Sequence, residues 1–466
     1  VDTVGGATFT SKGILAAVQN ALENGGVDTT ALMEKKEVVV EKAADETLEA
    51  DVVVIGAGGA GLAAAITAEQ NGAKVIIVEK MGKTGGNTIL AGGAVNAVED
   101  RSEFAIKQND SVYWHYWQTL NGGDWQGDPE LVMTLVENAY EGIQWTKELG
   151  MEWLGEEAVF TVSGGLWPRA WKPAGKASAG FFETYGKYID GTDKIDLMLN
   201  TKAEKILTND KGEACGIIAT GETGNTITIN AKSVVVATGG FAKNVELRQA
   251  YNTQWATLGE QIKSTNHEGA TGDGIIMASN VGAALTHLQD MMCVLKDYEI
   301  MAFHNGNSTT ANVSSFISRD NTVLVNKNAK RFCDEKDIGY MTQALNQPIF
   351  DQMHRDELGY VWAISDVASL EAKGVVRGLG MEFITADTFE ELAEKMELPV
   401  EAVVASLTNY NTYVEAGHDP EFGRLLLAPL TAPYAAVRVM PCEIITYGGI
   451  ARNVEAEVIR ADGTVI

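Results

Sequence analysis

The chain has 466 residues with 45% apolar and 21% charged side chains, which is typical of a folded protein with more than one domain. Its formal net charge of -27 argues against nucleic acid or an anionic membrane as a partner, because like charges repel. No apolar run is long enough to predict a transmembrane helix.

The N-terminal segment combines a glycine turn with an amphipathic helix. The turn Gly5–Thr8 resembles the end of the FMN-binding domain in which flavin mononucleotide is esterified to a threonine, although that domain usually has serine at the position of Gly6. The resemblance implies that residues 1–26 are the C-terminal tail of such a domain and that Thr8 carries covalent FMN. A plain capped turn is the alternative. Residues 27–49 are rich in Glu, Lys and Ala, and we expect a linker there.

A dinucleotide fingerprint follows the expected linker. The apolar run 51–55 stops at Gly56 and continues as Gly56-x-Gly58-x-x-Gly61 into an alanine-rich helix. These glycines allow a tight turn, close approach of the backbone to a pyrophosphate, and close helix–strand packing. A second apolar run ends at Glu79, whose carboxylate can accept hydrogen bonds from a ribose. Because strand, turn, helix and acid occur in the required order, the pattern predicts a Rossmann-like nucleotide site.

Further glycine-rich segments indicate places where the backbone approaches a flat ligand. Together with the fingerprint they give the candidate cofactor-binding residues, which are Gly56, Gly58, Gly59, Ala60, Gly61, Glu79, Lys80, Gly85, Gly86, Asn87, Thr88, Ala91, Gly92, Gly93, Ala203, Ala237, Thr238, Gly239, Gly240 and Asp273. Asp273 stands at the start of a predicted helix, so a cofactor contact and an ordinary N-cap both remain open for it.

The other predicted elements come from apolar periodicity. They are a helix over 128–150 that begins at Asp128-Pro129, a hairpin of 213–219 and 225–230, strands at 233–237, 322–326 and 360–364, and helices within 387–416. Most of the nine tryptophans lie between Trp114 and Trp171, where packing is the favoured interpretation and an aromatic wall around a ligand is the alternative. The four cysteines and six histidines show no metal-ligand spacing, so no metal site is predicted.

Residues 288–438 have fewer glycine turns than the flanking sequence. The predicted fold class is therefore α/β, with a Rossmann-like nucleotide-binding domain in 50–287 that resumes in 439–466, and an inserted α+β substrate-capping domain in 288–438. The chain stops at 462–466, on what we expect to be a hairpin.

The 50–466 region resembles the flavoprotein subunits of the fumarate reductase and succinate dehydrogenase family, and most of all its soluble, FMN-domain-linked reductases. The matching motifs include Gly56–Gly61, Glu79-Lys80, Gly85–Thr88, Ala91–Gly93, Ala237–Phe241, His267–Gly274, Leu324–Asn326, Arg331–Glu335 and Tyr447–Gly449. The resemblance implies a glutathione-reductase-like FAD fold, non-covalent FAD, and hydride transfer from flavin N5 to a C=C bond. An external electron donor would reduce the FMN on Thr8, which would relay electrons to the FAD.

The same resemblance carries expectations about location and completeness. Covalent FMN in this family implies an extracytoplasmic enzyme of an anaerobic bacterium, with the cytoplasm as the alternative. The family's next FAD-binding segment and its substrate-binding arginine do not occur in this sequence. We therefore expect 439–466 to be an incomplete second part of the FAD-binding domain, either truncated or completed by another chain.

Departures from the family's fumarate site indicate a different substrate. Met291-Met292 and Ile444-Ile445 stand where the family has histidines, Ser315-Phe316 where it has a Thr-Glu pair, and Gly339 where it has the proton-donating arginine. Apolar side chains would leave a dicarboxylate badly paired, so a larger, less charged enoate or enone fits better than fumarate. Tyr340, beside the vacated arginine position, is the first candidate for proton donor, with Tyr447 and Arg319 as rivals.

Two other functions remain open. A ketosteroid-type dehydrogenase would run the chemistry in the oxidising direction, and a tyrosine-rich site with few cations is compatible with it. An electron-transfer module without its own substrate is the third hypothesis, although a capping domain argues against it.

Overall fold

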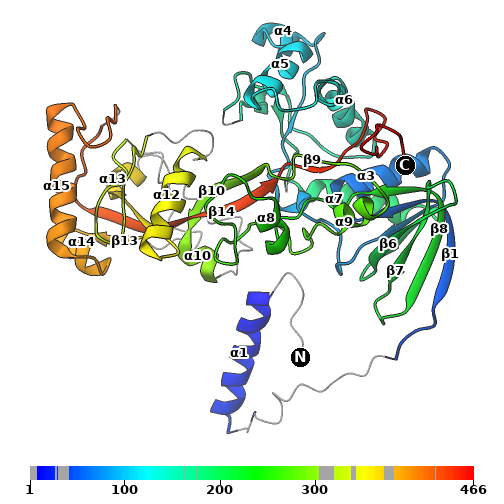
Figure 1. The fold of residues 1–466 in the computed structure, drawn as a ribbon, viewed down its shortest axis with the longest axis horizontal. Helices are drawn as coiled ribbons and strands as arrows, with labels where there is room; N and C mark the ends of the chain where they lie inside the picture. The colour runs from blue at the N-terminus through cyan, green and yellow to red at the C-terminus, as the bar shows by residue number, and fades with distance from the viewer. Residues whose placement is uncertain are drawn as a thin grey trace.

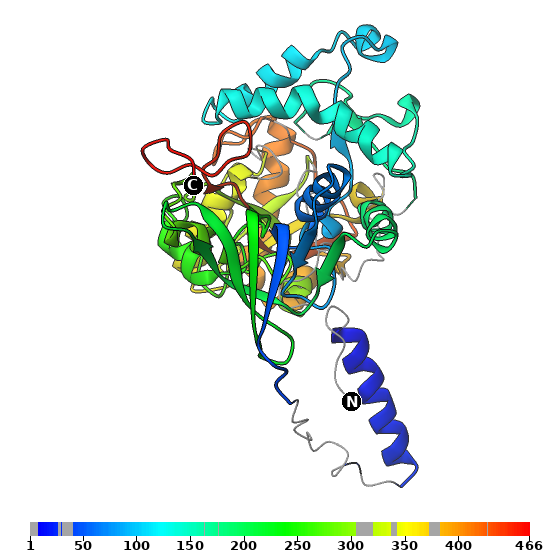
Figure 2. The same cartoon turned by 90° about the vertical axis from the view of Figure 1, so that its right-hand side faces the viewer.

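The computed structural model shows two sheets joined by long strands (Figure 1). It describes residues 8–26, 29, 41–162, 164–175, 177–303, 320–336, 343–371, 383–425 and 427–466. Within these ranges, no helix is both long and apolar enough to span a bilayer. The described chain begins with α1 (Thr8–Asn24), which Figure 2 shows apart from the sheets.

The first sheet has six strands in the order β5-β2-β1-β8-β7-β6. The strands are β1 (Glu46–Ile55), β2 (Val75–Val78), β5 (Ile195–Met198), β6 (Lys202–Thr208), β7 (Ala214–Thr220) and β8 (Thr226–Val236). The first four in that order are parallel, whereas β7 and β6 form an antiparallel extension. This arrangement confirms the predicted nucleotide-binding α/β sheet and the predicted hairpin, which is β7–β8.

Two predicted boundaries in this sheet need correction. β1 begins at Glu46, inside the expected linker, because Glu46–Glu49 pairs with Ile227–Asn230 of β8. The two strands expected at 225–230 and 233–237 are one continuous strand, β8. Both strands continue through polar residues such as Glu46 and Asn230, because pairing between the strands satisfies the backbone N–H and C=O groups of these residues.

Helices cover both faces of the parallel strands. On one face, α3 (Gly59–Gln70) and α7 (Ala179–Asp190) pack on Val54, Val75 and Ile77. On the other face, Met277 of α9 (Asp273–Asn280) joins the cluster formed by Val53 and Ile76. Because both faces are buried, the strands are continuously apolar rather than alternating, which is why they are recognisable in the sequence.

A helical segment with most of the tryptophans follows β2. It contains η1 (Thr88–Leu90), β3 (Val95–Asn96), α4 (Glu103–Gln108), α5 (Val112–Gly122), α6 (Pro129–Glu148), η2 (Glu156–Ala158) and β4 (Ala170–Trp171). The predicted helix start is confirmed, since Asp128 caps α6 through the N–H groups of Glu130 and Leu131. Trp171 is buried with Ile143, and Trp114 stacks on Trp167 at a centroid distance of 5.6 Å.

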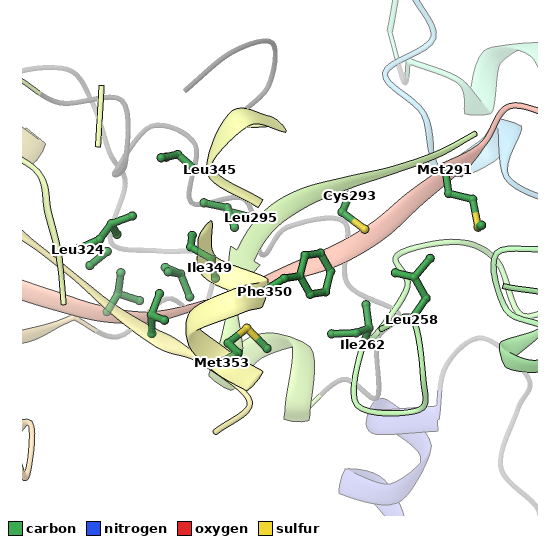
Figure 3. Packing of buried hydrophobic residues seen from close by; sticks show 14 of the residues in the cluster. Leu258, Ile262, Met291, Cys293, Leu295, Leu324, Leu345, Ile349, Phe350 and Met353 are labelled. Carbon is green, nitrogen blue, oxygen red and sulfur yellow. The ribbon is translucent and has the colours of Figure 1, made fainter. Parts of the chain in front are cut away.

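The second sheet is antiparallel, with strand order β10-β14-β12-β11 and β13 paired to β14. Its strands are β10 (Met291–Asp297), β11 (Val323–Val325), β12 (Val361–Asp366), β13 (Ile384–Ala386) and β14 (Tyr434–Thr446). The helices of this part are α10 (Tyr298–Phe303), α12 (Gln343–Asp356), α13 (Val367–Glu371), α14 (Phe389–Lys395) and α15 (Val400–Ala416). Leu345, Ile349 and Phe350 of α12 pack on one face of this sheet (Figure 3), and α14 and α15 pack on the other.

β14 connects the two parts of the molecule (Figure 1). This 13-residue strand runs without interruption through 438–439, where the sequence suggested a domain boundary. Its first half pairs with β12 up to Val439, and its second half pairs with β10 up to Thr446. The part expected to cap the substrate and the part with the first sheet therefore share a strand rather than meeting at a loop.

The remaining elements pack against the apolar cluster that covers one face of the second sheet. They are α8 (Val245–Tyr251) and the short strands β9 (Leu285–Thr286) and β15 (Gly449–Ile450), which pair with each other. The expected C-terminal hairpin is confirmed by a bridge between Ile459 and Val465.

A buried ion network stabilises the second sheet. Arg331 donates to both oxygens of Glu335 at 2.9 and 2.8 Å and to Asp419 at 2.9 Å, and Arg424 donates to Glu335 at 3.0 Å. Burial alone lowers the pKa of Arg331, but the hydrogen bonds to Glu335 and Asp419 raise it above its ordinary value. All these charges are therefore compensated inside the fold.

We expect Arg331→Met to lower the free energy of unfolding by about 3 kcal/mol, because it leaves buried carboxylates without their counter-charge. Urea unfolding followed by circular dichroism measures the change. Lys42→Met is the control, because Lys42 pairs with Asp45 on the exposed surface and should change stability little. Equal effects of the two substitutions would contradict the importance of the buried network.

Candidate cofactor and active site

The turn after β1 brings three backbone segments into close contact. Gly56 has φ +104°, and a Cβ at this position would lie 2.6 Å from the Ala237 carbonyl oxygen. A Cβ on Gly61 would overlap the Gly56 carbonyl oxygen. Helix α3 begins at Gly59, its N-cap residue Gly58 has no side chain, and the Gly59 N–H donates to the Thr88 hydroxyl at 3.3 Å. The turn thus combines a tight cradle with a helix N-terminus, the arrangement that binds a pyrophosphate.

Glu79 stands at the end of β2 and is tied to this turn. Its Oε2 accepts from the Ala57 N–H at 2.8 Å, and its Oε1 accepts from the Met81 N–H at 2.8 Å. Each carboxylate oxygen keeps lone-pair capacity for another donor. The predicted ribose-binding acid is therefore held in a fixed orientation by the backbone.

These residues enclose a cavity of about 370 Å³. The candidate residues that line it are Gly56, Gly58, Gly59, Ala60, Glu79, Lys80, Gly86, Asn87, Thr88, Ala203, Ala237, Thr238, Gly239 and Asp273. The lining residues that sequence reasoning missed are Ile55, Val78, Met81, Thr201, Lys202, Val236, His267, Gly269, Ala270 and Met277. The glycine cradle, the helix N-terminus and the oriented acid fit the dinucleotide part of FAD.

Six candidate residues do not line this cavity, namely Gly61, Gly85, Ala91, Gly92, Gly93 and Gly240. Several of these glycines allow contacts within the chain instead. A Cβ on Gly93 would lie 2.7 Å from the Ser178 nitrogen, and one on Gly240 would overlap the Thr446 hydroxyl. A Cβ on Gly92 would meet nothing within 4 Å. No tryptophan of the described chain lines the cavity, in agreement with the packing interpretation.

Lys80 and Asp273 form an ion pair on the cavity wall. Lys80 Nζ donates to Asp273 Oδ2 at 2.7 Å and to the Thr271 hydroxyl at 2.6 Å. Burial tends to raise the pKa of Asp273, but the hydrogen bond from Lys80 lowers it below its ordinary value. Gly272, rather than Asp273, is the N-cap of α9, so the N-cap interpretation of Asp273 is wrong. The pair connects the segment after β2 to the start of α9.

The end of β14 reaches the same wall. The Ile444 carbonyl accepts from Asn266 Nδ2 at 2.9 Å, and Asn266 Oδ1 accepts from Asn87 Nδ2 at 2.5 Å. On the other side, the Thr446 hydroxyl accepts from the Phe241 N–H at 3.3 Å. Residues 444–447 therefore lie between the segments that carry Asn87 and Gly239, two cavity-lining residues.

Of the three candidate catalytic residues, the described part of the structure contains Tyr447. Tyr447 is 58% exposed, and its hydroxyl donates to Met292 Sδ at 3.1 Å. Tyr340 and Arg319 lie outside the described residues. Thr8 is the first residue of α1, and its side chain is likewise outside the described part of the structure.

Sequence reasoning missed Asn266 and Glu443. Asn266 directly precedes the matching motif His267–Gly274 but was not chosen as a site residue. Glu443 did carry a signal, because it is an acid inside the apolar run Pro441–Ile445.

Gly61 and Gly92 provide a matched pair for testing the cradle. We expect Gly61→Ala to lower the free energy of unfolding by about 2 kcal/mol and to weaken FAD binding at least tenfold, because its Cβ overlaps the Gly56 carbonyl. Gly92→Ala should change neither quantity, since its Cβ enters open space. Thermal unfolding and FAD titration of the apoprotein measure both effects. Weaker FAD binding in Gly92→Ala would mean that the cofactor site extends to that turn.

Comparison with known proteins agrees with this geometry. Residues 51–466 match the family described as an FAD binding domain. Urocanate reductase of Eggerthella lenta is 31% identical over 100% of this chain and 76% of its own length. NADH:fumarate oxidoreductase of Klebsiella pneumoniae is 32% identical over 99% of this chain, but the chain spans only 47% of that relative.

Solved structures give the same result. The open conformation of a flavocytochrome c3 fumarate reductase has a TM-score of 0.76 at 30% identity, over 90% of this chain and 71% of that one. A 3-ketosteroid Δ1-dehydrogenase from Sterolibacterium denitrificans has a TM-score of 0.69 at 18% identity, over 90% and 92%, and shares the fold. The chain therefore belongs to the FAD-binding family of fumarate reductase-like flavoproteins.

Proposed function

We propose that the protein is an FAD-dependent reductase that transfers a hydride to the C=C bond of an α,β-unsaturated carboxylate or carbonyl compound other than fumarate. The observation that carries this proposal is the apolar end of β14, which is hydrogen-bonded through Asn266 to Asn87 in the wall of the FAD cavity. Relatives named for the reduction of urocanate, acrylate and fumarate support the reaction class, because all three compounds are unsaturated carboxylates.

The apolar residues Met291-Met292 and Ile444-Ile445, which stand where the family's fumarate site has histidines, favour a substrate with fewer carboxylates than fumarate. Among the described residues that line the cavity, the permanent cations are Lys80 and Lys202, and each pairs with an acid, Asp273 and Glu204 respectively. Burial lowers the pKa of His267, so this imidazole is neutral at pH 7. The described lining of the FAD cavity therefore adds no unpaired cation beside these apolar positions, and a second carboxylate would lack a counter-charge there.

Apolar groups occupy the adjoining surface. Met292 is opposite Ile445 in the β10–β14 pairing, and its sulfur accepts from the Tyr447 hydroxyl. Ile445 and Tyr447 are exposed, by 39% and 58% of their surface. Such a surface favours an extended apolar or aromatic substituent on the unsaturated acid or ketone.

When bound, FAD supplies the hydride for the β-carbon. The residues of this chain bind the cofactor, exclude water and deliver a proton to the α-carbon. Tyr447 is the described candidate for this proton transfer, because its ionisable phenol is exposed at the end of β14. Tyr340 and Arg319 remain the other candidates.

We also propose that covalent FMN on Thr8 relays electrons from an external donor, in an extracytoplasmic enzyme. This part is supported by the Gly5–Thr8 motif. Mass spectrometry of the peptide that contains Thr8, from protein made in a host that attaches FMN, tests the attachment. Unmodified Thr8 would remove the relay from the proposal but not the FAD-dependent reaction.

Anaerobic reoxidation of the dithionite-reduced protein tests the reaction. The acceptors are fumarate, urocanate, cinnamate and a 3-ketosteroid with a C=C bond conjugated to its ketone. We expect urocanate or cinnamate to reoxidise the flavin at least tenfold faster than fumarate, because one carboxylate needs fewer counter-charges. Faster reoxidation by fumarate would refute the substrate assignment, and no reoxidation by any acceptor would refute the reductase.

The proton donor is tested with the acceptor that reacts fastest. We expect Tyr447→Phe to slow reoxidation about 100-fold with FAD content unchanged, because only the ionisable group is removed. An unchanged rate in Tyr447→Phe together with a large loss in Tyr340→Phe would assign proton delivery to Tyr340 instead.

A further inference from the structure

A carboxyl group is buried in β14, two residues before its apolar end reaches the cavity. Glu443 has no solvent exposure, and its backbone lies between β10 and the segment 263–265. Its N–H donates to the Lys263 carbonyl at 3.0 Å, and its carbonyl accepts from the Thr265 N–H at 3.2 Å. The position of this side chain is therefore set by main-chain pairing.

A chain of hydrogen bonds leads from this carboxyl group to the cavity. Glu443 Oε2 accepts from the Ser264 hydroxyl at 2.9 Å, and that hydroxyl oxygen accepts from Asn266 Nδ2 at 3.1 Å. Asn266 Oδ1 then accepts from Asn87 Nδ2, and Asn87 Oδ1 accepts from the His267 N–H at 2.6 Å. Asn87 and His267 both line the cavity. The orientation of Asn87 thus depends on Asn266, which in turn depends on Ser264.

The second oxygen of Glu443 is unusual. Oε1 is buried and has no hydrogen-bond partner among the described residues, and the same holds for Arg248 Nε. A buried carboxylate oxygen without a donor is costly when ionised, whereas a neutral carboxyl group is tolerated better. The geometry therefore favours the protonated form.

The charged groups around Glu443 oppose the preference for the protonated form but do not cancel it. The groups that face it are Arg248 of α8, Lys243, Cys293 of β10 and Cys442 of β14. Burial raises the pKa of Glu443 to about 7, against the opposing effects of Ser264, Arg248 and Lys243. Both forms are consequently accessible near neutral pH.

We propose that Glu443 is a positioning residue whose neutral carboxyl group, acting through Ser264 and Asn266, holds Asn87 in place on the wall of the FAD cavity. The inference rests on the proposed binding of FAD in that cavity. Ionisation disturbs the chain, because a carboxylate is a stronger acceptor than the Ile444 carbonyl for the Asn266 N–H. In the structure, Asn266 Nδ2 lies 3.5 Å from Glu443 Oε2 and 2.9 Å from the Ile444 carbonyl oxygen. A rotated Asn266 releases Asn87, so FAD binds less tightly at high pH.

The test is the apparent dissociation constant of FAD, measured by titrating the apoprotein at pH 6 and pH 8 without substrate. For the wild type we expect binding to be about tenfold weaker at pH 8, because ionisation of Glu443 opposes binding. Glu443→Gln should bind at both pH values as the wild type does at pH 6, since its amide oxygen accepts from Ser264 without a charge. Glu443→Leu removes the acceptor and should bind at least tenfold more weakly at both.

Two controls separate this role from other causes. Glu246→Gln, on the exposed face of α8, should keep the pH dependence of the wild type. His267→Asn should also keep it, because that imidazole is not the group proposed to titrate. The reduction potential of bound flavin at both pH values gives a second measurement, and its change with pH should differ between wild type and Glu443→Gln.

The outcomes distinguish this inference from the proposed function. A wild-type affinity that does not change with pH, or a pH dependence that survives in Glu443→Gln, would overturn the role of Glu443 and leave the reductase intact. Loss of the pH dependence in His267→Asn alone would overturn it as well. A wild type that binds no FAD would overturn both.

Discussion

The close packing of backbone around Gly56 and Gly61 is the constraint on which the nucleotide-binding half depends. At this point the end of β1, the start of α3 and the Ala237 carbonyl of the segment after β8 leave no room for a Cβ. Because these three segments meet without side chains between them, the start of α3 lies at the cavity, which Gly59 and Ala60 line. Glu79 accepts hydrogen bonds from the same turn and from the segment after β2, so the cradle and the acid form one rigid unit.

The sequence was sufficient for features that depend on local chemistry. Apolar runs bounded by glycine predicted the parallel strands, and Asp128-Pro129 predicted the start of α6 correctly. Glycine pairs were less informative, because a close approach to a ligand and a close approach to another segment need the same residue. Gly93 and Gly240 illustrate this ambiguity, since the segments they approach belong to the protein itself.

Contacts between distant residues were beyond sequence reasoning. Asn87 and Asn266 are 179 positions apart, as are Ser264 and Glu443. No local sequence pattern predicts such a pairing, because Asn and Ser are common in turns of every kind. The extension of β1 to Glu46 was missed for the same reason, as it depends on residues 227–230 of β8, which are distant in the sequence.

The continuity of β14 has a mechanical consequence. Beyond Val439 this strand is no longer paired with β12, residues up to Thr446 pair with β10, and Glu443 also pairs with residues 263–265 on its other edge. A rotation of the second sheet would therefore reach Ile444–Tyr447 through an uninterrupted strand rather than through a loop. It would displace the Ile444 carbonyl, and with it Asn266, which holds the cavity-lining Asn87.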